Sequence, residues 1–478
     1  MTAVATEKQF YSPLAECPAP TPVPATEGTL AAHYAAHLLQ GLPLACAGNA
    51  PLSLENTQAD VDAARDWAAS GLMWLTGRPG EPPARAAHAV ASCARGALQA
   101  FSRLCAPGAA LPDTGATLLV ERAALLGLAR RERRSANGSC HLLRSADGWL
   151  ALNLARADDR ALLPAWVQAA DVEDDLGQLQ AMVALRKTSD LLERGHLLGL
   201  PVAAPGGEDS AHWFKRSFRG TPRAPRTGVP PLVVDLSALW AGPLCASLLH
   251  SAGARVIRVE STTRPDPTRQ AAPAFFDLLN AGKEQVALDF GSERALAQLR
   301  QLLAVADIVI EGSRPRALRQ LGILAEDVVA VRPGVVWLSL TGYGRAEPFA
   351  NRVAFGDDAA FAAGLCAVEP RTSAPVFCGD ALCDPLLGLH AALAALAFWQ
   401  SGEAALLDFN LHDVGAHCRG FHCSANPGAV VWQREGWMLE VGGQRFPVQR
   451  PRGRTPGTRA APSGWHTEQV IREFCSAC

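Results

Sequence analysis

The spacing of apolar and polar residues divides the chain into a helical first part and an alternating second part. Small and apolar residues recur about every three to four positions over 29–42, 60–75 and 88–105, a spacing typical of amphipathic helices. We therefore predict an Ala-rich helical block over residues 26–118. The proline-rich segment 1–25 that precedes it has no such period, and we expect it to be a disordered tail.

Residues 119–205 follow a different pattern. A helical segment leads into two short runs on either side of the turn Ser145–Gly148, which predict a β-hairpin. Another helical segment and a strand-like exit follow. We predict a small α+β domain here, joined to the rest of the chain by a polar linker rich in proline and glycine at 206–229.

From Pro230 onward, short buried strands alternate with helices. This alternation predicts an α/β fold with a doubly wound, mostly parallel, Rossmann-like sheet, which we assign to 230–478. The last part of the chain is predicted to form a β-ribbon and then a helix from about His466, and we call this part the C-terminal return. The predicted strands are 231–236, 254–260, 286–290, 307–312, 335–344 and 406–411, and the clearest predicted helices are 241–251 and 292–304.

Three large classes of α/β enzyme are excluded by what the chain lacks. The first predicted β–α turn, 235–243, has no G-x-G-x-x-G, so the dinucleotide fingerprint is absent. The sequence also holds no P-loop and no G-x-S-x-G nucleophile elbow. An enzyme with this sheet would therefore need an active site of another kind.

Composition limits the binding partners and the cellular compartment that we expect for the protein. A net charge of -2 over 478 residues gives no electrostatic argument for nucleic acid or an anionic membrane, and no apolar run is long enough to span a bilayer. The 13 cysteines without a secretory leader indicate free thiols and a cytoplasmic protein. The His/Cys cluster 412–423 and the pair Cys475–Cys478 lack the spacing of zinc ligands, so we predict no metal site and no permanently bound cofactor.

One stretch, Phe377–Trp399, joins a polar turn to a long apolar helix at Asp384-Pro385. Aspartate is a preferred helix N-cap and proline is favoured at the first helical position. The partial positive charge of a helix N-terminus would keep this carboxylate ionised. An ionised carboxylate at the mouth of an α/β domain serves as a cap or as a nucleophile, and both interpretations remain open on this pattern alone.

Several segments of the second half resemble the family III CoA-transferases, the group that includes the formyl-CoA, carnitine and benzylsuccinate CoA-transferases. The nucleophile of that family is an aspartate that opens a helix and is followed four residues later by glycine, as Asp384 is by Gly388. Asp380 is a competitor, although Asp384 rather than glycine stands four residues after it. The order and spacing of the matching segments carry the resemblance; they are 232–260, 266–269, 278–290, 307–322 and 340–352.

The resemblance implies an acyl-CoA:carboxylate CoA-transferase, with a CoA thioester and a carboxylic acid as substrates. Asp384 would attack the thioester to give a mixed anhydride and then an aspartyl-CoA thioester, which splits one difficult exchange into easier covalent steps. Formyl-CoA transferase has glutamine where Trp240 stands, so its polar contact there is not implied. The implied CoA contacts are Trp240, Ala241, Gly242 and Pro243 at the thiol end, Leu288, Gly312, Ser313 and Arg314 at the nucleotide, and Arg258, Arg264 and Arg269 at the phosphates.

Two alternative functions remain. An α-methylacyl-CoA racemase or epimerase on the same fold needs a histidine within the segment aligned with 353–360, where this chain has none; Asp357 or Asp358 would have to replace it. A non-catalytic CoA-binding scaffold is the other alternative. The family's interlocked assembly implies a homodimer as the expected state.

The first half also resembles the family, but out of its usual order. Gly71 precedes Gly96 by 25 residues and Gly364 precedes Gly388 by 24, which aligns Ser92 with Asp384. A serine cannot form the anhydride, so we interpret the helical block as a truncated, inactive copy of the large domain. The segment 133–154 resembles the family's small domain, here placed before the sheet.

Overall fold

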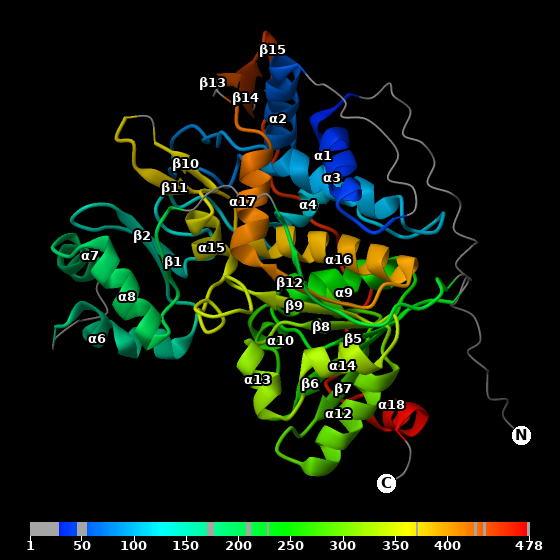
Figure 1. Ribbon diagram of the computed structural model, residues 1–478. Helices are drawn as coiled ribbons and strands as arrows, with labels where there is room; N and C mark the ends of the chain where they lie inside the picture. The colour runs from blue at the N-terminus through cyan, green and yellow to red at the C-terminus, as the bar shows by residue number, and fades with distance from the viewer. Residues whose placement is uncertain are drawn as a thin grey trace, which may run out of the picture.

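A seven-stranded sheet lies at the centre of the computed structural model (Figure 1), with the strand order β4-β12-β9-β8-β5-β6-β7. All neighbours run parallel except β4, which is antiparallel to β12. The strands are β4 (Lys215–Arg219), β5 (Leu232–Asp235), β6 (Arg255–Ser261), β7 (Glu284–Leu288), β8 (Ile308–Glu311), β9 (Val336–Thr341) and β12 (Ala405–Asn410). The structure describes residues 28–44, 55–169, 176–206, 212–226, 229–369, 371–424, 428–433 and 436–475.

The strand order has a point where the chain changes direction across the sheet. From β5 the chain adds β6 and β7 on one side, then returns to add β8, β9 and β12 on the other. This is the order of a Rossmann-like, doubly wound sheet, so the mostly parallel α/β sheet predicted from the strand–helix alternation is confirmed. Ligands of such sheets bind outside the carboxyl ends of the strands at this switch point, here between β5 and β8.

Side chains of the parallel strands alternate between two buried layers. Val233 and Leu338 contribute to the core beneath α9 (Ala241–Ser251) and α16 (Cys383–Ser401), whereas Val234 and Trp337 contribute to the core on the opposite face. That opposite face is covered by α12 (Glu293–Val305), α14 (Ala325–Val331) and α18 (Thr467–Phe474), as Figure 1 shows. Burial on both faces explains why these strands are near-continuous apolar runs.

Helix α16 is buried along almost its whole length because helices of the first half cover it. A helix that is apolar all round has to be enclosed in this way, and the Tyr34 hydroxyl reaches His390 Nε2 of α16 at 2.8 Å. The helices predicted in the N-terminal block therefore share one continuous core with the sheet domain. They are α1 (Leu30–Gln40), α2 (Asn56–Ser70) and α3 (Val90–Ser102). The short α4 (Gly115–Leu118), which was not predicted, and α5 (Glu121–Leu126) follow.

The small domain has its own sheet and core. The predicted hairpin around Ser145–Gly148 is present as β1 (Cys140–Arg144) and β2 (Trp149–Asn153), and β3 (Val202–Ala203) completes a three-stranded antiparallel sheet. Helices pack on this sheet, and Figure 1 shows the domain beside the large sheet. They are η1 (Ala157–Leu162), α6 (Leu163–Val167), α7 (Leu176–Ala184) and α8 (Thr188–Leu198).

Several elements differ from the predictions. Strand β4 lies inside the predicted linker 206–229, where its mostly exposed sequence KRSFR gives no alternating pattern. The hairpin of β10 (Cys366–Val368) and β11 (Pro375–Phe377) before α16 was also not predicted. The remaining elements are α10 (Thr268–Ala271), α11 (Pro273–Asn280), α13 (Pro315–Gln320), α15 (Gly356–Ala362), α17 (Leu411–Phe421), β13 (Ala429–Gln433), β14 (Gly436–Val441) and β15 (Gln444–Pro447).

Some sequence predictions concern residues outside this description. The tail 1–25 and Cys478 are not among the described residues. Within the described part of the chain, no helix has both the length and the apolar character that a bilayer span requires. The C-terminal return contains the predicted β-ribbon and a final helix, α18.

Candidate active site

A cavity of about 260 Å³ opens at the switch point of the sheet. Its walls come from the loops after β5, β8 and β9 and from the first turn of α16, as the strand order predicts. It is lined on one side by Leu239, which has a positive φ of 70°, and on the other by Asp384 and Leu387. Of the twelve candidate site residues, the cavity brings together Ala241, Gly242, Gly312, Ser313, Arg314 and Asp384.

Asp384 is the second residue of α16, so the interpretation of its side chain as the N-cap is wrong. The helix begins at Cys383, and Leu382 precedes it without a side-chain cap. The early start follows from Ala381, which has a φ of 45° and accepts a hydrogen bond from Asp384 N at 2.9 Å. The Asp384 side chain is therefore free of a capping role and lines the cavity.

Burial gives the Asp384 carboxyl group an unusual pKa. Its pKa is raised from 3.8 to about 7, mainly by burial and further by the nearby Asp357 and Asp380 carboxylates. The Arg122 guanidinium and the Gly356 backbone N–H, which hydrogen-bonds to the carboxylate, lower the pKa and offset part of this shift. The expectation that the helix N-terminus alone keeps Asp384 ionised was wrong, because loss of hydration outweighs the helix-end field.

Asp380 is held in an ion pair away from the cavity. Arg122 Nε and Nη2 donate to its two oxygens at 2.7 and 2.8 Å, and the side chain is fully buried. Asn137 Nδ2 joins Asp380 to Asp357, at 2.9 and 2.8 Å. Asp357 also accepts from Ala381 N at 2.7 Å, and burial raises the pKa of its carboxyl group to about 6. These contacts give Asp380 a structural role and leave Asp384 as the carboxylate of the cavity.

The first half of the chain supplies two of the side chains in this cluster. Arg122 comes from α5 and Asn137 from the segment before β1, more than 240 residues from Asp380 in the chain. The Arg122 guanidinium also lies over the Trp240 ring, 4.6 Å from its centroid. Sequence reasoning missed both residues because nothing local distinguishes one arginine or asparagine in these segments.

Three candidate contact residues face the protein interior. The Trp240 ring is buried edge-to-face against Phe275, with ring centroids 5.0 Å apart. The Pro243 carbonyl accepts a hydrogen bond from Lys283 Nζ at 2.9 Å. Leu288 is buried at the end of β7, where its carbonyl accepts from Thr262 N. None of the three lines the Asp384 cavity.

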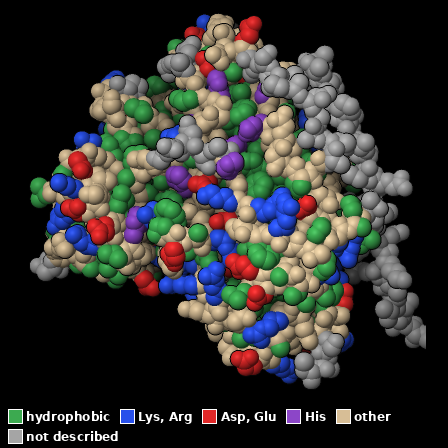
Figure 2. Space-filling view, viewed as in Figure 1, with side chains coloured by type: hydrophobic (Ala, Val, Ile, Leu, Met, Phe, Trp, Pro, Cys, Tyr) green, Lys and Arg blue, Asp and Glu red, His purple; other side chains and the backbone are tan. Residues whose placement is uncertain are grey.

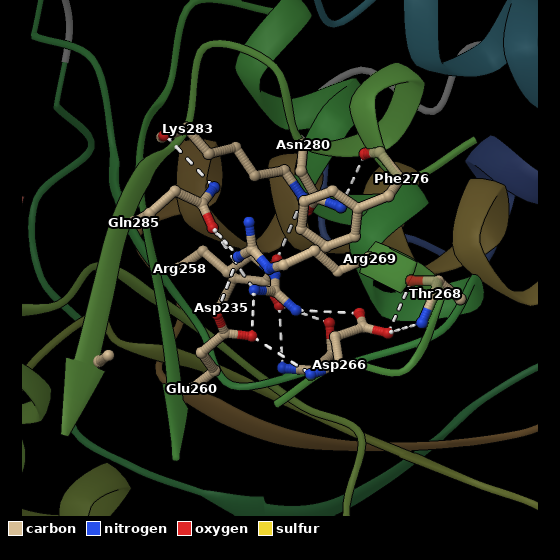
Figure 3. Close-up of polar contacts among 12 residues, drawn as sticks. Asp235, Arg258, Glu260, Asp266, Thr268, Arg269, Phe276, Asn280, Lys283 and Gln285 are labelled. Atoms are coloured by element: carbon tan, nitrogen blue, oxygen red, sulfur yellow. Dashed lines mark hydrogen bonds and ion pairs between the residues drawn. The ribbon is translucent and has the colours of Figure 1, made fainter. Parts of the chain in front are cut away.

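Two of the three candidate phosphate arginines are committed to ion pairs inside the protein (Figure 3). Arg258 is fully buried and binds Glu260 and Asp266, each at 2.9 Å, and Arg269 binds Glu260 at 2.8 Å. Both guanidinium groups also lie over the Phe276 ring. Their assignment as phosphate partners is therefore corrected: they stabilise the segment after β6.

The third, Arg264, lines a neighbouring cavity of about 450 Å³ with other arginines. Arg314 and Arg316 at the start of α13 line the same cavity, and Arg156 reaches it from the small domain. Arg156 and Arg314 also line the Asp384 cavity, so the two spaces adjoin. Figure 2 shows Lys and Arg side chains gathered on this face, between the small domain and α13.

Two glycines allow close approaches at the site. A Cβ on Gly356 would overlap Asp384 Oδ2 and the Ala381 carbonyl, so no larger residue fits there. A Cβ on Gly388 would lie 2.5 Å from the Ala241 carbonyl oxygen, closer than real Cβ atoms approach. Glycine four residues after Asp384 thus lets α9 bring its N-terminus against α16.

The same close approach occurs between helices of the first half. A Cβ on Gly96 of α3 would overlap the Ala31 carbonyl of α1 and touch Tyr34 Cβ, as a Cβ on Gly388 would meet Ala241 O and Leu244 Cβ. At the position aligned with Asp384, Ser92 is buried and donates to Asp66 Oδ2 at 2.7 Å.

No metal centre is evident at these sites. Within the described residues, no group of three or more His, Cys, Asp or Glu side chains is arranged to hold a metal ion. The charged side chains that line the Asp384 cavity are Asp384, Arg156, Arg314 and Arg352.

Comparison with known proteins shows a similarity between part of this chain and one family. Residues 231–427 match CoA-transferase family III. Human succinyl-CoA:glutarate CoA-transferase is 28% identical over 276 residues, covering 54% of this chain and 58% of that protein. Succinyl-CoA--D-citramalate CoA-transferase of Chloroflexus aurantiacus is 27% identical over 203 residues, covering 40% of this chain and 50% of the relative.

A crystal structure of a CAIB/BAIF family protein from Brucella suis is 26% identical, with a TM-score of 0.39, over 45% of this chain and 65% of that chain. The chain spans about half the length of the curated relatives it matches. The matched segment contains the parallel strands from β5 to β12, Asp384, and every lining residue of the switch-point cavity except Arg156. Residues 231–427 of this chain, which hold these features, are therefore similar to CoA-transferase family III.

Proposed function

We propose that the protein is an acyl-CoA:carboxylate CoA-transferase and that Asp384 is its nucleophile. The observation that carries this proposal is the position of the Asp384 carboxyl group, which lines the switch-point cavity beside a second cavity lined by arginines. Arg264, Arg314 and Arg316 suit the phosphates of CoA, since guanidinium groups bind phosphate in a bidentate manner. The thioester end would then enter the Asp384 cavity.

In the first half-reaction the ionised Asp384 carboxylate attacks the thioester carbonyl, and the carbon–sulfur bond breaks. The products are a mixed anhydride and the CoA thiolate. The thiolate then attacks the Asp384 carbonyl, which releases the donor acid as a carboxylate and leaves an aspartyl-CoA thioester. Each exchange is divided into covalent steps of lower barrier.

In the second half-reaction the acceptor carboxylate attacks the aspartyl-CoA carbonyl and expels the thiolate. The thiolate attacks the acceptor's acyl carbonyl in the new anhydride, forming the product thioester and regenerating the Asp384 carboxylate. Backbone N–H groups at the N-terminus of α9, at Ala241 and Gly242, line the cavity and are available to bind the developing oxyanion. The site has to exclude water, which would hydrolyse the anhydride.

The test is to trap the covalent intermediate. After incubation with acyl-CoA, hydroxylamine should convert Asp384 to a hydroxamate that peptide mass spectrometry locates, and Asp384→Asn should abolish both the adduct and transfer. Asp289→Asn, at an exposed position after β7, is the matched control and should retain both. Full transfer activity in Asp384→Asn, or an adduct at another residue, would refute this assignment.

The structure offers less support to the two alternatives. A racemase would need a second acid/base beside the substrate, but Asp357 and Asp358 are buried and do not line the Asp384 cavity. Exchange of an α-proton into deuterated water would reveal such an activity. A scaffold without catalysis would bind CoA yet form no adduct at Asp384.

We infer that the first half of the chain is a degenerate copy of the large domain and that it now completes the site in the second half. The matching close approaches of α1 to α3 and of α9 to α16, at Gly96 and Gly388, support common descent. Ser92 removes the nucleophile from the first copy. The contact of Arg122 with Asp380 supports a present role, because it sets the charge around Asp384.

A further inference from the structure

A larger cavity of about 920 Å³ lies between the small domain and the large one. The small domain contributes α8 and β3, and the large domain contributes the segment after β9 and the start of α17. Its lining residues include Glu193, His196, Lys215, Tyr343, Phe349, Arg352, His412 and Asp413. Arg352 also lines the Asp384 cavity, so the two spaces meet at this side chain.

Arg352 differs from Lys215 and His412 of the larger cavity because no carboxylate among the described residues pairs with it. Lys215 Nζ lies 3.8 Å from Asp413 Oδ2, and His412 Nδ1 lies 3.1 Å from Asp413 Oδ1. Among the described residues, by contrast, no carboxylate pairs with the partly buried Arg352 guanidinium. Glu193, on the opposite wall, is exposed to solvent.

Aromatic rings hold the Arg352 side chain in place. Its guanidinium carbon lies 4.8 Å from the Phe349 ring centroid and 5.6 Å from that of Tyr343. Stacking on rings fixes the plane of a guanidinium and leaves its N–H edges free to bind a carboxylate in a bidentate manner. A positioned, uncompensated charge of this kind, facing two joined cavities, is suited to an anionic group of a bound molecule.

We propose that the larger cavity is the acid subsite and that Arg352 binds the second carboxylate of a dicarboxylic acid. The first carboxylate of the same molecule would reach into the adjoining Asp384 cavity, where the exchange occurs. This proposal rests on the proposed CoA transfer, and it adds a substrate class and the residue that selects it. The cavity is larger than a short diacid, so charge at Arg352 rather than shape provides the selection.

The test compares two acceptors with the same diacid carbon chain, glutarate and its monomethyl ester, which lacks one negative charge. The wild type should prefer glutarate in kcat/KM, and Arg352→Gln should reduce kcat/KM for glutarate by about 10- to 100-fold, the range for loss of a charged hydrogen bond, with little change for the ester. Arg294→Gln is the matched control, because it removes a cation at an exposed position of α12 that lines neither cavity. It should keep the preference of the wild type.

Equilibrium binding of glutarate separates this proposal from the proposed function. Binding that depends on Arg352 without any CoA transfer would support the acid subsite and refute the transferase. Transfer with the same glutarate preference in Arg352→Gln as in the wild type would refute the subsite and leave the transferase intact. If Arg352→Gln weakens binding of CoA but not of glutarate, Arg352 is a phosphate partner and the proposal is wrong.

Discussion

The raised pKa of Asp384 makes a quantitative prediction about the pH dependence of the first covalent step. Only the carboxylate can attack a thioester, and with a pKa of about 7 about one-tenth of the groups are ionised at pH 6 and about nine-tenths at pH 8. The rate of adduct formation should therefore rise about tenfold between these pH values. An aspartate at its ordinary pKa of 3.8 would give no rise in this range.

The variant Arg122→Gln tests the cause of this pKa. It removes the positive charge that opposes protonation of Asp384 and that pairs with Asp380 at 2.7 Å. Loss of an adjacent opposite charge raises a carboxyl pKa by about 1–3 units, so the midpoint should move to about 8 or higher. At pH 7 the rate should fall at least about fivefold. Arg122→Lys keeps the charge and should shift the midpoint less.

Single-turnover mass spectrometry of the Asp384 adduct, from about pH 5.5 to about pH 9, measures the midpoint directly. Circular dichroism of Arg122→Gln at each pH shows whether the variant remains folded. A wild-type rate that is flat between pH 6 and pH 8 would refute the raised pKa. A wild-type midpoint that Arg122→Gln leaves unchanged would refute the role of Arg122.

Three further predictions concern the surroundings of the site. Burial raises the pKa of Asp358 to about 7, so its stabilising contribution is full below about pH 4 and is lost as pH rises through 7. Asp358→Asn should therefore be more stable than the wild type at pH 8, by up to about 4 kcal/mol. At pH 4 the two proteins should be similarly stable in denaturant titrations. Gly356→Ala places a Cβ on Asp384 Oδ2 and should slow transfer about 100-fold, whereas Gly291→Ala should leave it unchanged. Arg258→Gln removes the ion-pair partner of the buried Asp266 and one of the two partners of Glu260, and it should lower the unfolding free energy by about 3–5 kcal/mol; unchanged stability would contradict the buried network. Arg314→Gln, at the cavity wall, should instead weaken CoA binding in calorimetry with little loss of stability.

Much of the fold followed from local pattern. The helix predicted at 241–251 is α9 with the same ends, and the strand–helix alternation predicted the parallel sheet. These features depend on which face of each element is buried, and the spacing of apolar residues within the element indicates that face. Strand β4 was missed because an exposed edge strand buries too little to leave a pattern.

The candidate site, like the fold, could be predicted only in part from the sequence. The sequence alone determined that a carboxylate followed by Gly388 stands at the start of an apolar helix, and the resemblance to the CoA-transferases singled out Asp384 as the candidate nucleophile. The tertiary structure decided its protonation, since the pKa depends on burial and on Arg122, which the chain places more than 250 residues away. It also decided that Arg258 is an internal ion-pair partner while Arg352 faces two cavities. Charge type is a property of a residue, but desolvation and partners are properties of its neighbours in space, and those neighbours come from distant parts of the chain.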